Sequence, residues 1–265
     1  MVRLVSANAA SGRDRGRHDF AAWARHAAAL DADVYAVQEV DHRLPRSGVE
    51  DQAAVLAGAC QRPGETWTHR FAAAVLGTPG SRDTFAPATS ADLGADGAAY
   101  GVALVTRHRV TRFHELRMDG SRVTIPMPLP PGAPQRVMWV PDEPRVALAA
   151  EVAAPSGTLT VVSTHLSFEP LRAGRQLREV TAWASGLPGP VVLLGDLNMP
   201  ARVAAWLSGW APLARHPTYP AEGPRVQLDH ALRAPGHRLR VTSSRAEVVG
   251  GSDHLALVVD VALGG

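Results

Sequence analysis

The segment VVLLGDLN, residues 191–198, is the stretch that is most informative about the fold. Its four leading apolar residues predict a buried strand, and polar residues follow at the strand's end. Asp196 and Asn198 occupy alternate positions, so their side chains lie on the same side of an extended backbone. An acid and an amide that leave a buried strand together indicate a site at the edge of a sheet.

Five other segments repeat this design, in which an apolar strand meets a carboxylate, amide or imidazole. They are Asn8 in VRLVSAN, Glu39 in VYAVQEV, His165 in TLTVVSTHL, Asp229 in QLDHAL, and the pair Asp253 and His254 in GGSDHLALVVD. Taken singly, each has a simpler explanation as a turn former, a loop residue, a core histidine or a cap. Taken together they favour one oxygen-rich rim that suits a hard divalent cation, magnesium or manganese.

Alternating strands and helices predict an α+β fold. We expect helices in residues 18–30, 49–60 and 170–185, the last with Pro170 in its first turn. Strands are expected at 2–8, 34–40, 70–76, 100–107, 145–152, 158–166, 191–198, 227–232, 238–249 and 254–263. Residues 77–97 and 125–144 are rich in turn residues and proline, and we predict long loops there. No linker divides the chain, so one domain over residues 1–265 is the simplest interpretation.

The amino-acid composition excludes several kinds of catalytic and metal-binding chemistry. The 265 residues are 46% hydrophobic, which is enough for a large core, and the net charge of +2 provides no broad basic field. All 27 residues counted as Lys or Arg are Arg, which excludes lysine-based covalent catalysis. Cys60 is the single cysteine, which excludes an intramolecular disulfide and a thiolate metal cluster. The N-terminus lacks a signal-peptide pattern and no apolar run is long enough to span a membrane, so we expect a cytoplasmic monomer.

In chain order, the motifs SAN, VQEV, STHL, GDLN, QLDH and SDH resemble those of the endonuclease/exonuclease/phosphatase superfamily, and the resemblance covers essentially the whole chain. It implies a four-layer α/β/β/α sandwich of two packed, mostly antiparallel sheets with helices on both outer faces. It also implies a divalent-metal-dependent hydrolase of phosphate esters, a phosphodiesterase or phosphatase that uses in-line attack by an activated water. Uncharacterised bacterial members are the most similar in appearance.

The resemblance assigns a role to each motif residue. It implies metal binding by Asn8, Glu39 and Asp253, and catalytic roles for His165, Asp196, Asn198, Asp229 and His254. Asp196 matches the acid that orients or deprotonates water, and His254 matches the imidazole on the phosphoryl oxygen with Asp229 as its partner. The glycines before this pair let the backbone turn tightly, so that Asp253 can reach the metal while His254 faces phosphate.

Substrate choice stays open. WVPDEPR, residues 139–145, resembles the Tyr-Xaa-Pro-Asn stretch of abasic-site endonucleases, but carries Trp139 for Tyr and Asp142 for Asn. These departures weigh against a faithful repair nuclease. Arg145 is the candidate for substrate binding, because its planar guanidinium can form two hydrogen bonds to one phosphate. A surface ion pair explains the presence of this arginine equally well. For Trp206 and Trp210 we predict core or helix–loop packing. A DNase-like or abasic-site nuclease and a noncatalytic binding module remain the alternative functions.

Overall fold

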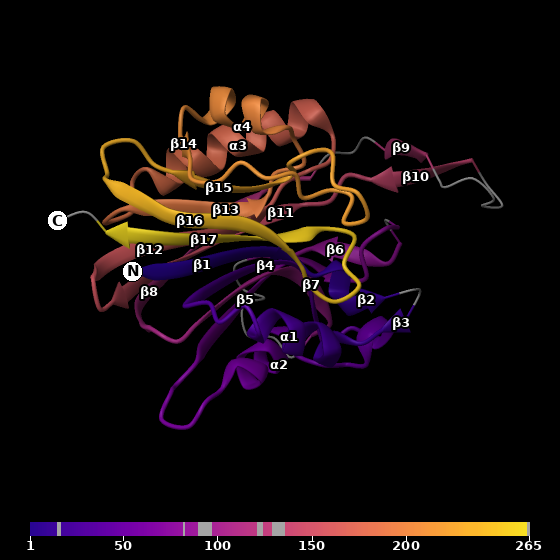
Figure 1. Ribbon diagram of the computed structural model, residues 1–265. Coiled ribbons are helices and arrows are strands. Elements are labelled where there is room, and N and C mark those ends of the chain that lie inside the picture. The colour runs from indigo at the N-terminus through magenta and orange to yellow at the C-terminus, as the bar shows by residue number, and fades with distance from the viewer. Residues whose placement is uncertain (15–16, 82, 90–96, 121–123, 129–135, 264–265) are drawn as a thin grey trace.

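The computed structural model describes residues 1–14, 17–81, 83–89, 97–120, 124–128 and 136–263. Two sheets form its centre (Figure 1). Within the described residues, the first sheet has seven strands in the order β16 (Leu239–Val248), β17 (Leu255–Leu263), β1 (Val2–Asn8), β4 (Val34–His42), β7 (Ala99–Thr106), β5 (Thr68–Gly77) and β6 (Phe85–Pro87). The second has six, in the order β14 (Ala211–Pro212), β15 (Asp229–Arg233), β13 (Val191–Asp196), β12 (Gly157–His165), β11 (Arg145–Ala154) and β8 (Arg109–Met118).

Strand directions in both sheets are mainly antiparallel, as predicted. Among the described strands, β1 runs parallel to β4, and β12 runs parallel to β13. The other neighbouring pairs in these two sheets are antiparallel. Because each sheet contains one parallel pair, two adjacent strands in each sheet end at the same rim, and this brings distant motifs together.

Helices cover the outer face of each sheet, which completes the predicted four-layer sandwich (Figure 1). Helices α1 (Phe20–Ala28) and α2 (Gln52–Cys60) pack on the first sheet, and α3 (Pro170–Ala184) and α4 (Ala201–Ser208) pack on the second. Asp19, Asp51 and Glu169 accept hydrogen bonds from backbone amides in the first turns of α1, α2 and α3, which fixes where these helices begin. No helix in the described ranges has both the length and the apolarity of a membrane span.

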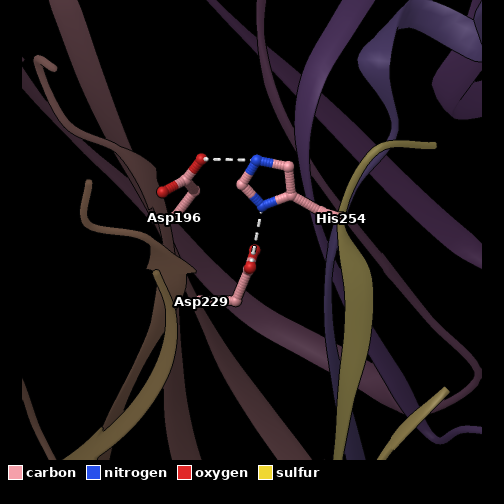
Figure 2. Close-up of side chains that lie close together, drawn as sticks. All are labelled: Asp196, Asp229 and His254. Atoms are coloured by element: carbon pink, nitrogen blue, oxygen red, sulfur yellow. Dashed lines mark hydrogen bonds and ion pairs between the residues drawn. The ribbon is translucent and has the colours of Figure 1, made fainter. Parts of the chain in front are cut away.

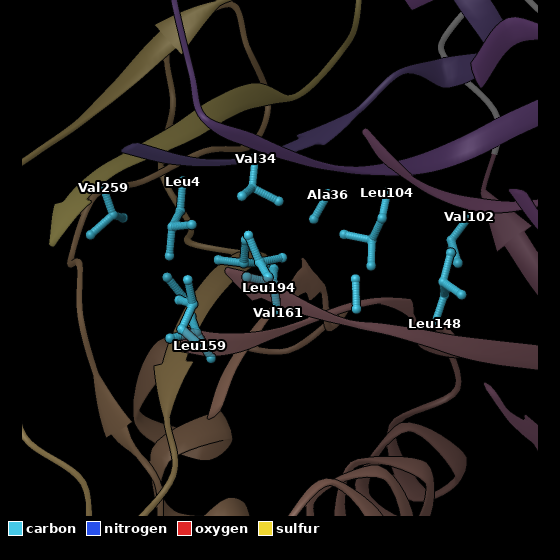
Figure 3. Packing of buried hydrophobic residues seen from close by; sticks show 14 of the residues in the cluster. Leu4, Val34, Ala36, Val102, Leu104, Leu148, Leu159, Val161, Leu194 and Val259 are labelled. Carbon is cyan, nitrogen blue, oxygen red and sulfur yellow. The ribbon is translucent and has the colours of Figure 1, made fainter. Parts of the chain in front are cut away.

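The space between the sheets is filled by aliphatic side chains (Figure 3). Leu4, Val34 and Leu104 from the first sheet meet Leu148, Leu159 and Leu194 from the second, and all six are essentially inaccessible. Burying one such side chain contributes roughly 1.5–3 kcal/mol. This packing holds the two sheets in a fixed relationship, on which a site shared between them depends.

Strand polarity brings the motif residues to one rim. Strands β1, β12 and β13 end there at Asn8, His165 and Asp196, and β4 reaches it at Glu39. Strands β15 and β17 run in the opposite direction, so Asp229 and His254 stand where these strands begin. The register places His165 beside Asp196 and Asp196 beside Asp229.

The structure corrects several predictions. Within 125–144, β9 (Thr124–Pro128) pairs with β10 (Val137–Pro141), and within 77–97, β6 pairs with β5, so these stretches are not simple loops. Proline is tolerated on such short edge strands because an unpaired side of the strand needs no N–H donor. Residues 82, 90–96 and 129–135 of the two predicted loops lie outside the described residues. Trp210 is buried, but Trp206 is 78% exposed on α4, so its predicted packing is wrong.

Short elements complete the chain. They are η1 (Ala10–Gly12), β2 (Arg13–Asp14), β3 (Arg17–His18) and η2 (Pro45–Ser47). Strand β8 was not among the predicted strands, and its polar and charged side chains are mostly partly exposed at the edge of the second sheet. Helix α4 was not among the predicted helices either. Both β8 and α4 pack against elements that contribute site residues, so the prediction left out part of the structure that surrounds the site.

Candidate active site

A buried chain of three side chains forms the centre of the rim (Figure 2). Nδ1 of His254 lies 2.8 Å from Oδ2 of Asp229, and Nε2 of His254 lies 3.7 Å from Oδ2 of Asp196. Burial lowers the pKa of His254, but the hydrogen bond and charge of Asp229, with the charge of Asp196, outweigh this and raise the pKa to about 10. His254 is therefore an imidazolium at neutral pH, with a proton on each ring nitrogen.

Asp196 lies between the imidazolium and the rest of the site. Burial raises its pKa, and the negative charge of Asp229 adds to this effect, so that the pKa of Asp196 rises to about 7. Its Oδ1 accepts a hydrogen bond from the backbone amide of Asn198 at 2.9 Å. A carboxylate with a pKa near neutrality can accept and release a proton under physiological conditions.

Asn8 connects Asp196 to Glu39. Its side-chain Nδ2 donates to Oε1 of Glu39 at 3.0 Å and to Oδ2 of Asp196 at 3.1 Å. Its Oδ1 accepts from the backbone amide of Ala10 at 3.0 Å, which fixes the orientation of the side-chain amide. Asn8 thus holds two carboxylates, one from each sheet, at a short and defined separation.

The backbone of β4 is irregular at Glu39. The pairing of β4 with β7 shifts register between Val37 and Val40, which leaves Glu39 in a bulge. Glu39 has a φ of +55°, and Asn198 has a φ of +52°, both in the left-handed region. Such a conformation is uncommon for residues other than glycine, and strained positions of this kind concentrate at functional sites. The bulge aims the half-buried Glu39 carboxylate at Asn8 rather than into the sheet ladder.

His165 and Asn198 form the neighbouring part of the rim. Nδ2 of Asn198 lies 3.2 Å from Nε2 of His165 and donates to the carbonyl of Leu166 at 3.0 Å. Burial, followed by the charges of Arg145 and His254, holds the pKa of His165 well below its usual value. A neutral His165 can accept the proton of Asn198 at Nε2, which leaves Oδ1 of Asn198 as an acceptor for a water.

The remaining predicted residues lie at the border of this group. Arg145 is only 5% exposed, and its Nε has no hydrogen-bond partner among the described residues. Asp253 is exposed, and its backbone carbonyl accepts a hydrogen bond from the amide of Ala221. The structure therefore brings Asn8, Glu39, His165, Asp196, Asn198, Asp229 and His254 into one hydrogen-bonded or ion-paired group, with Arg145 and Asp253 beside it.

Supporting residues that sequence reasoning missed hold this arrangement. Ser252 donates to the carbonyl of Asn8 at 2.7 Å and accepts from the amide of His254 at 3.2 Å, which joins the ends of β1 and β17. Oγ1 of Thr218 accepts from the amide of Asp229, and the Tyr219 ring lies 4.9 Å from that of His254. Ser252 stands inside the SDH motif, which could have identified it, whereas Thr218 and Tyr219 lie in a loop without such a signal.

The donor set fits a hard divalent cation. Glu39 and Asp196 offer carboxylate oxygens, with Asn8 bonded between them. Cys60 is the last residue of α2 and lies among the residues that pack on the first sheet. Ligand atoms of Asp196, Asp229 and His254 also lie within 4.8 Å of one another. An imidazolium has no lone pair for a metal, however, so the Glu39 side is the better place for an ion.

Comparison with known proteins identifies the family. The model of the Endonuclease/Exonuclease/phosphatase family matches residues 5–254, and the chain therefore belongs to this family, whose members hydrolyse phosphoesters. This confirms the resemblance predicted from the motifs. A search of curated proteins found no match.

Solved structures share the fold. An endonuclease/exonuclease/phosphatase from Beutenbergia cavernae DSM 12333 is 23% identical with a TM-score of 0.71, over 100% of this chain and 72% of that chain. A family protein from Leptotrichia buccalis C-1013-b is 15% identical with a TM-score of 0.66, over 99% of this chain and 100% of the other. A mannosyl-6-phosphatase from Bacteroides thetaiotaomicron VPI-5482 is 14% identical with a TM-score of 0.59, over 99% and 100%.

Proposed function

We propose that this protein is a divalent-metal-dependent phosphoesterase in which a water activated beside Asp196 attacks phosphorus in line with the leaving group. The observation that carries the proposal is the buried sequence of contacts from Asp229 through His254 to Asp196, continued through Asn8 to Glu39. It combines a proton acceptor, a cationic donor and a site for a hard ion within one rim.

Asp196 is the residue that orients the water and receives its proton. The hydrogen bonds from Asn8 Nδ2 and the Asn198 amide fix its two oxygens, and its pKa of about 7 matches the task of a base. Oδ1 of Asn198 would hold the same water from a second direction. Two fixed acceptors of this kind keep the nucleophile in line with the bond that breaks.

His254 stabilises the negative charge that builds on the phosphoryl oxygens. Its Nε2 proton is the one available for donation, because Nδ1 is bonded to Asp229. A preorganised donor aimed at developing charge contributes roughly a hundredfold to a thousandfold in rate. His165, neutral and close to Arg145, would serve the phosphate or the leaving group.

Glu39 would hold the divalent ion, with Asn8 beside it and the exposed Asp253 at its edge; magnesium or manganese suits these oxygen donors. When bound, such an ion neutralises charge on the phosphoryl group. Arg145, which lines the same narrow gap as His165, would then bind the substrate phosphate beside it. Among structural relatives, the mannosyl-6-phosphatase is one named phosphatase with this fold, which agrees with a phosphate ester as substrate.

The test is hydrolysis by the purified chain in magnesium, in manganese and in EDTA. The substrates are an aryl phosphomonoester, an aryl phosphodiester, plasmid DNA and an abasic duplex. We expect turnover of at least one ester in metal and none in EDTA, with a large loss in Glu39→Gln and His254→Ala. Full turnover in EDTA would contradict the proposal. A folded protein inactive on every ester would instead favour a noncatalytic binding module, and preference for plasmid or abasic DNA would favour a nuclease.

A further inference from the structure

A pocket of about 600 Å³ opens beside the active site. Its walls come from Ala74 on β5 and from residues within three segments, 85–88 on and just after β6, 117–120 at the end of β8 and 142–145 at the start of β11. The first segment belongs to the first sheet and the other two to the second sheet or its approach, so the pocket lies between the edges of the two sheets. Its volume falls in the range of roughly 300–1,000 Å³ that is typical of small-molecule sites.

Strand register places this pocket at the catalytic rim. Arg145, the first residue of β11, pairs with Met118, the last residue of β8, and both line the pocket. Arg145 also lines a narrow gap together with Tyr100 and His165. Its charge helps to lower the pKa of His165, after burial. Arg145 therefore borders both the pocket and the gap at His165, so a ligand in the pocket would lie next to the proposed phosphate site.

Among the described residues, the charged side chains that line the pocket are of both signs, two arginines and two aspartates, so the pocket is not strongly basic. Arg117 lies 3.2 Å from Glu115 and donates to the carbonyls of Ala73 and Ala88, so its charge is already neutralised. Asp142 accepts from Ser167 and lies 3.6 Å from Arg172.

Two polar groups of the lining are left to meet a ligand. Arg145 is 5% exposed, with its Nε unpartnered within the described chain. Asp119 is exposed at the mouth and can accept hydrogen bonds. One fixed cation and one carboxylate in a partly apolar pocket do not suit a second phosphate, which Asp119 would repel.

We propose that this pocket binds the organic group of the substrate, and that this group is a single polyhydroxylated ring of sugar or cyclitol size. The inference rests on the proposed phosphoesterase function. A hydroxyl both donates and accepts, so neighbouring hydroxyls match a guanidinium and a carboxylate in one pocket. Phe85, Met118 and Pro144 offer apolar surface to the face of such a ring that is formed by its C–H bonds.

Two pocket variants test the proposal on the full chain. Asp119→Ala removes the acceptor at an exposed position, and Pro87→Trp adds bulk at the exposed β6 wall. The probes are glucose 6-phosphate and myo-inositol 1-phosphate, with p-nitrophenyl phosphate as an ester that lacks hydroxyls. For Asp119→Ala we expect kcat/KM for the preferred ring phosphate to fall by about tenfold or more through KM, which corresponds to one hydrogen bond to a charged group. Pro87→Trp should lower the same value because the added indole occupies the space of the ring. The value for p-nitrophenyl phosphate should fall much less.

Asp83→Ala is the matched control, because Asp83 is an exposed acid near β6 that does not line the pocket. It should leave all three values unchanged. An equal effect of the pocket variants on all three esters, or no effect on any of them, would overturn the proposal.

Binding in EDTA separates this proposal from the proposed function. Calorimetry or NMR titration of the same ring phosphates into metal-free protein should detect binding that Asp119→Ala weakens by about tenfold. If no ester is hydrolysed but this Asp119-dependent binding persists, the pocket stands and the phosphoesterase function fails. If neither ring phosphate binds at millimolar concentration, or if Asp119→Ala binds as tightly as the wild type, the pocket proposal is wrong.

Discussion

Nδ1 of His254 and Oδ2 of Asp229 lie 2.8 Å apart in a buried pair, and the second carboxylate oxygen of Asp229 has no hydrogen-bond partner within the described residues. Asp229 thus directs its charge at one imidazole, and the pKa of His254 rises to about 10 as a result of this bond and the nearby acids, against the opposing effect of burial. The two residues act as one cationic donor with a fixed direction.

Asp229→Asn should therefore shift the pH dependence of activity. In the proposed mechanism the charged form of His254 is the active one, so we expect activity to be lost as pH rises through its pKa. Removing the carboxylate lowers that pKa, and the alkaline limb of the kcat/KM profile should move to lower pH. Asp253→Asn is the control, because Asp253 is exposed and contributes less to the pKa of His254. Superimposable alkaline limbs for wild type and Asp229→Asn would show that Asp229 does not set the charge of His254.

Asp196→Asn should separate activity from stability. We expect turnover to fall by about a hundredfold or more, because the variant lacks the carboxylate that the proposed mechanism uses as the base for water. The folded pKa of Asp196 is about 7 against an ordinary 3.8, so the folded state binds more protons in that interval and stability falls as pH rises through it. The amide cannot ionise, so this loss should be smaller in the variant. Urea unfolding from pH 4 to 8 in EDTA measures the unfolding free energy of both proteins. If this free energy changes with pH in the same way in the wild type and in Asp196→Asn, the raised pKa does not belong to Asp196.

Glu39→Gln should weaken metal dependence and rate together. The change keeps the shape of the side chain and its contact with Asn8 but removes the charge that attracts a cation. A magnesium titration of activity should show half-saturation at about tenfold higher concentration or more. Glu179→Gln makes the same chemical change at an exposed position on α3, on the outer face of the second sheet, and should titrate like the wild type. Equal half-saturation in Glu39→Gln would exclude Glu39 as a ligand.

Ser252→Ala tests whether the turn before β17 positions His254. Its hydroxyl bonds the carbonyl of Asn8 and the amide of His254, so the variant should lose about 1 kcal/mol of unfolding free energy and several-fold in kcat, with little change in KM. Ser252→Thr keeps the hydroxyl and should recover kcat. Ser185→Ala removes an exposed hydroxyl at the end of α3 and serves as the control. A stability loss without a kcat loss would limit Ser252 to a structural role.

The sequence predicted the rim because its signal is simple: an apolar strand that ends in a polar residue marks a sheet edge, and six such ends occur in family order. The four-layer sandwich was implied by the family resemblance of these motifs, and the pairing of Asp196 with Asp229 agrees with their predicted places at strand ends. Edge strand β8 was missed because most of its residues, RVTRFHELRM, are polar or charged and exposed or partly exposed. It therefore lacks the regular alternation of polar and apolar residues that predicts a strand. Local periodicity also contains no information about which sheet contributes each side chain.

Details that depend on distant contacts could not be predicted. The orientation of the Asn8 amide is set by Ala10 and by two carboxylates from different sheets. The left-handed backbone at Glu39 follows from a bulge between β4 and β7, which is a property of the paired strands and not of VQEV alone. Thr218 and Tyr219 support Asp229 and His254 from a loop whose path is set by its packing.

The hydrogen bond from Asn8 to Asp196 joins the two sheets, so the hydrophobic interior that fixes their relative position also fixes the geometry of the site. Asn8 and His254 approach the rim from one sheet, Asp196 and Asp229 from the other, and the aliphatic layer of Figure 3 sets the offset between them. A hydrogen bond tolerates only a few tenths of an ångström. Any substitution that lets one sheet slide on the other would therefore misalign proton acceptor and cationic donor while the fold is still intact. If the proposed function is correct, the rate of ester hydrolysis will therefore depend on how accurately the two sheets are aligned.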